Sequence, residues 1–153
     1  MIEFATPIPS QKLPRPTSTL AKLGLAFERK FIRALRESTP RGIFVENNPW
    51  YSYVEDEVTR TCSPDFLIID EIDGYGIVGE IKLNRTPLAL QKLNDLYVPL
   101  LNSCSRKSGI SFKPVVIVKN LTTDSPRPQP RLTWAFNAIE PLFHWPGLGT
   151  VLW

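Results

Sequence analysis

The stretch Ser63–Lys82, SPDFLIIDEIDGYGIVGEIK, decides how this chain folds. It contains two apolar runs separated by a polar segment, and the Asp-Gly pair at 73–74 is a strong hairpin signal. Folding the chain back at this pair brings Asp65, at the outer end of one strand, beside Glu80 and Lys82 at the outer end of the other. Because residues two apart in a strand point to the same face, we expect these two carboxylates and one amine to converge.

The predicted convergence of two carboxylates is unfavourable unless another group offsets their repulsion. Two like charges that are brought close and partly desolvated repel each other. A divalent cation removes the conflict, and hard cations such as Mg²⁺ prefer oxygen ligands. An adjacent Lys can hold an anionic substrate group, orient a water or help it to deprotonate. The combination suits hydrolysis of a phosphodiester, and the simpler alternative is a surface hairpin with solvated charges.

The motif Pro64-Asp65, fourteen intervening residues and Glu80-Ile81-Lys82 resembles the PD-(D/E)xK nuclease superfamily. The resemblance implies a metal-dependent deoxyribonuclease with DNA as its partner. In such an enzyme Asp65 and Glu80 bind Mg²⁺ or Mn²⁺, the backbone carbonyl of Ile81 is a further ligand, and Lys82 is the catalytic lysine. We expect an endonuclease of phage or mobile-element type, acting in DNA processing, repair or recombination. Exonuclease action and RNA as substrate stay open, and a non-catalytic DNA-binding or assembly protein on a nuclease scaffold is the alternative from another class.

The composition predicts one globular domain of 153 residues, with 42% hydrophobic and 22% charged residues. No apolar run approaches a membrane span and no signal-peptide pattern begins the chain, so we expect no membrane partner and a cytoplasmic location, in the host if the chain is phage-encoded. Two cysteines do not make a disulfide framework. Residues 1–17 are expected to form an extended arm and 18–153 one nuclease-like domain, with a core at about 18–119 and an extension at 120–153.

The net charge of +3 hides a segregation along the chain. Residues 1–41 carry eight basic and three acidic residues, and residues 82–153 carry nine basic and three acidic residues. Residues 42–81 carry one Arg and nine acids. An acidic centre between basic segments suits a metal site in a surface that attracts a polyanion.

A helix is predicted from about residue 18 to residue 38, with Thr17, Ser18 or Thr19 as its cap. On a helical wheel, Glu28 is the only charge within the apolar arc. An unpaired buried carboxylate is costly, so Glu28 needs a partner. Many members of the resembled superfamily carry a Glu here at the edge of the metal site, which would make Glu28 a metal ligand. The alternative is a boundary Glu that pairs with Arg or Lys.

The other elements are expected in the order of the αβββαβ core of the restriction-endonuclease-like α/β fold, a mixed sheet flanked by helices. Strands are predicted at 43–46 and 50–55, with 58–62 extending an edge strand into the motif hairpin. A helix follows at about 87–101, where Pro99 should kink it or end it early. A buried strand at 114–118 should run parallel to the Glu80 strand.

Phosphate contacts are expected from basic and polar side chains around this core. The candidates are Arg29, Arg33, Arg36, Arg85, Gln91, Lys92, Arg106 and Lys107. We read residues 121–131 as an exposed loop. The tail at 141–153 is too apolar to be free, so we expect it to pack on the core or to form a homodimer contact.

Overall fold

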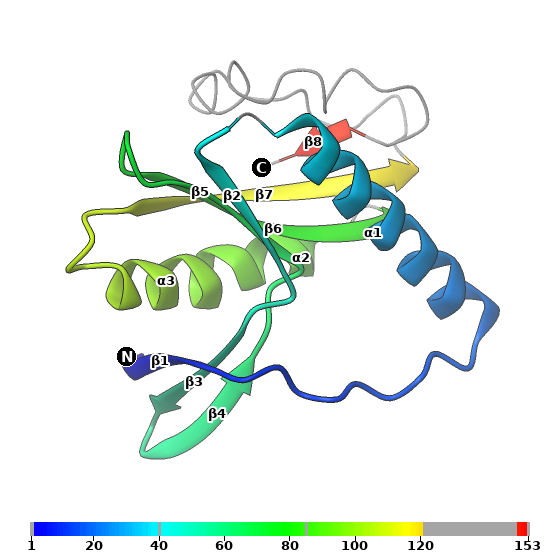
Figure 1. Cartoon of the computed structure of the whole chain (residues 1–153). Coiled ribbons are helices and arrows are strands. Elements are labelled where there is room, and N and C mark those ends of the chain that lie inside the picture. The colour runs from blue at the N-terminus through cyan, green and yellow to red at the C-terminus, as the bar shows by residue number, and fades with distance from the viewer. Residues whose placement is uncertain (1, 40, 85, 121–149, 153) are drawn as a thin grey trace.

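The computed structural model describes residues 2–39, 41–84, 86–120 and 150–152, and it has a mixed α/β fold with two sheets (Figure 1). The larger sheet has the order β2-β5-β6-β7-β8. Its strands are β2 (Ile43–Asn47), β5 (Phe66–Asp70), β6 (Tyr75–Asn84), β7 (Ser111–Asn120) and β8 (Thr150–Leu152). The smaller sheet has the order β1-β3-β4, with β1 (Glu3–Ile8), β3 (Trp50–Glu55) and β4 (Val58–Cys62).

The predicted hairpin is confirmed as the antiparallel pair β5–β6. Its register joins Phe66 to Gly79 and Asp70 to Tyr75. The connection is a four-residue loop at 71–74 rather than a two-residue turn at 73–74. The Asp70 carboxylate accepts hydrogen bonds from the backbone amides of residues 72 and 73, both at 3.1 Å, and these bonds shape the loop locally. Gly74, with φ +72°, supplies the left-handed residue that closes it.

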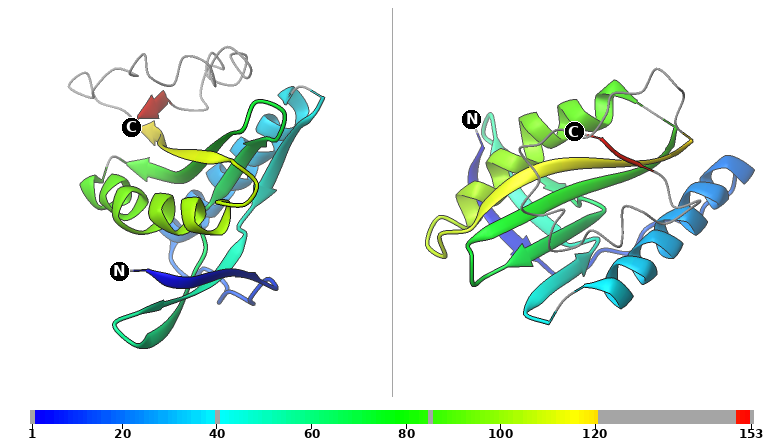
Figure 2. Two further views of the ribbon diagram at one scale, coloured as in Figure 1. Left: turned by 90° about the vertical axis from the view of Figure 1, so that its left-hand side faces the viewer. Right: turned by 90° about the horizontal axis from the view of Figure 1, so that it is seen from above.

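Helices cover both faces of the larger sheet. On one face lies α1 (Thr19–Ser38), and on the other lies a continuous helical segment made of α2 (Pro87–Lys92), the π-helical turn η1 (Leu93–Tyr97) and α3 (Val98–Cys104). The second segment also packs against the smaller sheet, so it lies between the two sheets (Figure 2). Side chains alternate along β6: Ile77 and Ile81 pack towards α1, whereas Val78 packs towards the other helix.

The first helix begins where the sequence predicts. The Ser18 hydroxyl accepts a hydrogen bond from the Ala21 amide at 3.1 Å and caps it. Its apolar arc buries Phe27, Phe31 and Leu35 at a spacing of four, together with Ile32. These side chains pack on β5, β6 and β7, so the amphipathic pattern fixes which face of α1 meets the sheet.

The second helix does not end at Pro99 but continues to Cys104, and the expected early end is wrong. The chain widens into the π-helical turn instead, where the Val98 amide donates to the Leu93 carbonyl five residues earlier. This turn precedes Pro99, which has no amide to donate and would crowd an ordinary helical turn. The widened turn therefore accommodates the proline without ending the helix.

The smaller sheet corrects two expectations. The N-terminal arm is extended, but Glu3–Ile8 pairs antiparallel with β3 instead of standing alone. The strand at 58–62 is confirmed, but β4 pairs with β3 in the smaller sheet and does not join the motif sheet. The proline at position 7 is compatible with this arrangement because β1 is an edge strand in the described part of the chain.

The predicted parallel pairing is confirmed: β7 runs parallel to β6, and Glu80 pairs with Val116. Residues 115–118 are all buried, as expected for a strand covered on both faces. From the apolar tail, β8 pairs antiparallel with β7, and the loop at 121–131 and the tail at 141–149 lie outside the described residues. No helix in the described ranges is long and apolar enough to cross a membrane.

Candidate active site

The backbone of Asp65 is fixed between two strands. It lies in the short connection from β4 to β5, where its amide donates to the Gly79 carbonyl at 3.1 Å. Its own carbonyl accepts from the Asn48 amide, just after β2, at 2.9 Å. The bond from Asn48 continues the pairing of β5 with β2, whereas the register of β5 with β6 ends at Phe66 and Gly79. Asp65 therefore lies just beyond that pairing, where the charge of Glu80 acts on its carboxyl.

The side chain of Asp65 turns onto the neighbouring strand. Its Oδ2 atom accepts a hydrogen bond from the Ile81 amide at 2.6 Å. Burial first, and then the nearby charges of Glu80 and, more weakly, Glu28 raise the pKa of this carboxyl to about 7 against the opposing effects of the Ile81 bond and Lys82. Asp65 is thus held close to a second acid without enough positive charge to offset both.

Glu80 is the only charged residue among the buried polar residues of the described chain, at 3% exposure. Its Oε2 atom lies 3.0 Å from the Lys82 ammonium, which confirms that the two side chains share a face of β6. Burial opposes the charge on Lys82, but the carboxylates of Glu80 and Asp65 outweigh it and raise the Lys82 pKa. Lys82 is therefore a cation at neutral pH, and its side chain remains 39% exposed.

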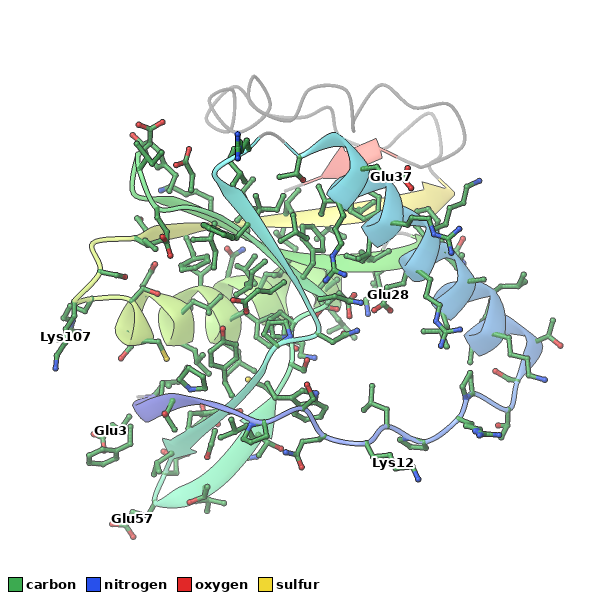
Figure 3. The ribbon with its side chains drawn as sticks, viewed as in Figure 1. Glu3, Lys12, Glu28, Glu37, Glu57 and Lys107 are labelled. Carbon is green, nitrogen blue, oxygen red and sulfur yellow. The ribbon has the colours of Figure 1, made fainter. Side chains whose placement is uncertain are left out.

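Glu28 finds a polar partner, but the partner is neither Arg nor Lys. Its Oε1 atom accepts from the Asn48 side-chain amide at 3.0 Å. Asn48 adopts φ +49°, a left-handed conformation that Asn tolerates better than most residues. Glu28 projects from α1 towards the sheet (Figure 3). It lies near enough for its charge to act on Asp65, but on the α1 side, whereas Glu80 faces the other helix.

An open cavity of about 420 Å³ lies between the first half of α1 and the end of β6. Its polar lining includes Glu28, Asp65 and Lys82, and its apolar wall includes Leu25 and Leu83. Glu80 lies beneath this surface and does not line it. An anionic group entering the cavity would meet the Lys82 ammonium beside two carboxylates.

The expected metal ligands are brought together only in part. In residues 2–39, 41–84 and 86–120, no group of three or more His, Cys, Asp or Glu side chains gathers closely enough to hold a metal ion. Asp65 and Glu80 are mutually close, while Glu28 is engaged with Asn48. Two carboxylates with incomplete compensation fit a hard cation that keeps several waters as ligands. The Ile81 carbonyl stays a predicted ligand.

The candidate phosphate contacts fall into separate groups. Three arginines form an exposed stripe on α1, at positions 29, 33 and 36, and two exposed side chains, Gln91 and Lys92, follow on the next helix. Arg106 and Lys107 lie in the turn before β7, beside the hairpin loop, and Figure 3 shows Lys107 far from Glu28. Five residues of strand separate that end of β6 from Glu80, roughly 17 Å, so these two do not adjoin the site. Arg85 lies outside the described residues.

Sequence reasoning missed two polar residues of the site. Asn48 falls between the predicted strands at 43–46 and 50–55, and Asn next to Pro often marks a special backbone conformation. Tyr97 falls within the predicted helix at about 87–101, among apolar residues, and a buried phenol hydroxyl normally has a partner. Here it donates to the Ser63 carbonyl at 3.0 Å, two residues before Asp65. A polar tip on an otherwise apolar face is the signal that could have identified it.

Comparison of the chain with protein-family models, with curated proteins and with solved structures finds no match.

Proposed function

We propose that this chain is a metal-dependent nuclease that hydrolyses phosphodiester bonds in DNA. One observation carries the proposal: Asp65 and Lys82 line an open cavity, and Glu80, buried beneath it, lies 3.0 Å from the Lys82 ammonium and close to the Asp65 carboxyl. A structural hairpin has no need to hold two acids together at the cost of a raised carboxyl pKa.

The order of elements supports a restriction-endonuclease-like core. When the strands of the smaller sheet are set aside, the chain order is α1, β2, β5, β6, the second helix and β7. This order corresponds to the αβββαβ order of the resembled superfamily. The β3–β4 hairpin stands as an insertion between β2 and β5. The last two core strands are parallel and joined by the helix, as that order requires.

In this proposal Asp65, Glu80 and the Ile81 carbonyl would hold Mg²⁺ or Mn²⁺. Such an ion, when bound, polarises a phosphoryl oxygen and lowers the pKa of a water. Lys82 is charged at neutral pH because the two carboxylates raise its pKa against the effect of burial. It therefore acts as a hydrogen-bond donor that orients the attacking water or a phosphate oxygen, rather than as the base that takes a proton.

The basic stripe on α1 is the proposed contact for the DNA backbone. Arg29, Arg33 and Arg36 are exposed and spaced by four and three residues, so they share one side of the helix. Phosphate contacts of this kind give affinity without sequence preference and weaken as salt rises.

Cleavage of circular and linear DNA in Mn²⁺ tests the proposal and separates endonuclease from exonuclease action. Asp65→Ala, Glu80→Ala and Lys82→Ala should each abolish cleavage while the protein stays folded by circular dichroism. Lys107→Ala is the matched control for Lys82→Ala, because it removes an exposed cation at the far end of the sheet. Full activity in Glu80→Ala would falsify the assignment. An RNA substrate in a parallel reaction decides which nucleic acid is cleaved.

A non-catalytic DNA-binding or assembly protein on the same scaffold is the second candidate. The separation of Glu28 from the acid pair favours it, because Glu28 is engaged with Asn48 and no three-acid cluster forms among the described residues. Thermal-shift titration distinguishes the two. A metal-binding chain gains about 2.7 kcal/mol when Mn²⁺ is present at one hundred times its dissociation constant, whereas a scaffold shows no gain in the wild type.

A further inference from the structure

The Tyr97 side chain is buried to 1% exposure, near enough to Glu80 and Asp65 for their charges to act on it. Its hydroxyl donates a hydrogen bond to the Ser63 carbonyl at 3.0 Å, and the nearby Glu80 carboxylate helps burial to raise the pKa of the phenol. One phenol thus bonds to the segment that carries Asp65 and lies near the carboxylate of Glu80. It comes from a different element, the helix that follows β6.

The π-helical turn explains how the hydroxyl reaches this position. The buried residues Ala89, Leu93, Tyr97 and Leu101 are spaced by four. In an ordinary α-helix, four residues rotate about the helix axis by roughly 40° more than a full turn. Over the three intervals from Ala89 to Leu101, the side chains would therefore move around the helix by roughly 120°. The wider turn at 93–97 rotates less per residue and keeps Tyr97 on the face that meets the sheet.

A phenol has one proton to donate and two acceptors compete for it here. In the structure the Ser63 carbonyl receives this proton at 3.0 Å. The buried hydroxyl is therefore satisfied, and its bond fixes the backbone of the Ser63–Asp65 segment near Glu80.

We propose that Tyr97 is a positioning residue that holds the Glu80 carboxylate and the Ser63–Asp65 segment in the arrangement that binds the metal ion. This inference rests on the proposed function and names the residue that pre-organises its site. It does not require Tyr97 to contact the substrate. Its aromatic ring is itself held, because the Lys92 ammonium lies 4.9 Å from the ring centre.

Isothermal titration with Mn²⁺ tests the role in Tyr97→Phe, which keeps the ring and removes only the hydroxyl. Loss of such a supporting hydrogen bond typically weakens metal affinity by about 10–100-fold, and we expect that loss together with a lower kcat and an unchanged KM for DNA. Tyr51→Phe is the matched control. It removes a buried hydroxyl from the same apolar cluster, but one that neighbours Glu46 and the two cysteines rather than Glu80.

Two outcomes overturn the inference: Mn²⁺ affinity in Tyr97→Phe that equals the wild type, or an equal loss in Tyr51→Phe. A second measurement covers the cases in which the wild type binds no Mn²⁺ or Tyr97→Phe does not fold. In the metal-free wild type, the ¹³C resonance of the Ser63 carbonyl should show an isotope shift when D2O deuterates the Tyr97 hydroxyl, because the following residue, Pro64, has no amide proton to exchange. Absence of that shift overturns the positioning role, whereas its presence without Mn²⁺ binding overturns the proposed function alone.

Discussion

Replacing Asp65 by Asn should stabilise the metal-free protein above neutral pH while it destroys metal binding. The Asp65 carboxylate accepts the Ile81 amide at 2.6 Å, and an Asn side-chain oxygen can accept the same bond. The substitution therefore removes the charge and keeps the geometry. What disappears is the burial of that charge and its repulsion with Glu80 and Glu28.

The magnitude follows from the pKa of Asp65. Burial, with the charge of Glu80, raises this pKa from 3.8 to about 7 in the folded protein. The folded state binds the Asp65 proton more tightly than the unfolded state does. The contribution of this proton to the free energy of unfolding is therefore fully present below pH 4 and is lost as the pH rises through about 7. A difference of about three between the folded and unfolded pKa values of Asp65 corresponds to at most about 4 kcal/mol in the free energy of unfolding. We expect Asp65→Asn to recover between about 1 and 4 kcal/mol at pH 8.

Urea denaturation in EDTA at pH 5 and pH 8 measures this gain. Wild type should lose stability between the two pH values, and Asp65→Asn should lose much less. Asp70→Asn is the control, because it changes an acid at the other end of the hairpin and retains an acceptor for the loop amides. Added Mn²⁺ should restore the stability of wild type at pH 8 and leave Asp65→Asn unchanged. The reasoning is refuted if metal-free Asp65→Asn is less stable than wild type at pH 8.

Three further substitutions test other parts of the structure. Gly79→Ala should cost about 3 kcal/mol in urea unfolding, because a Cβ there would lie 2.1 Å from the buried ring of Phe66; a cost below about 1 kcal/mol contradicts the packing. Glu28→Gln keeps the length of the side chain and an acceptor for Asn48, so the melting temperature should hold while Mn²⁺ binds several-fold more weakly by calorimetry. Unchanged affinity there would give Glu28 a purely structural role. Ser18→Ala should lower the stability by about 1 kcal/mol in thermal unfolding through loss of the helix cap, and an unaltered melting curve argues against that cap.

The local part of the site could be predicted because it depends on short-range rules. Alternation in a strand puts Glu80 and Lys82 on one face, and the two apolar runs set the register that brings Asp65 close to Glu80. The wheel also identified Glu28 as a charge that needs a partner. Each of these inferences uses only spacing within one element or across one hairpin.

The remainder depends on contacts between distant segments. The partner of Glu28 is Asn48, twenty residues away, and this contact depends on a left-handed backbone conformation that the sequence does not specify. The pairing of β1 with β3 joins segments about forty-five residues apart, and its register shifts between Glu3 and Thr6. The π-helical turn that places Tyr97 is likewise a tertiary outcome, since η1 has no distinctive composition.

The mixed pairing of the larger sheet also bears on how the protein assembles. The β5–β6 hairpin closes over a four-residue loop, whereas β6 and β7 pair in parallel only after the intervening helical segment has crossed over. Local closures are fast and distant ones slow, so the acids at the hairpin end are expected to meet before the layer that buries them exists. Early in folding their repulsion is screened by water, and it becomes strong only when β7 and the helix exclude solvent. The late, desolvating step is therefore where pH and divalent cations should change the folding rate.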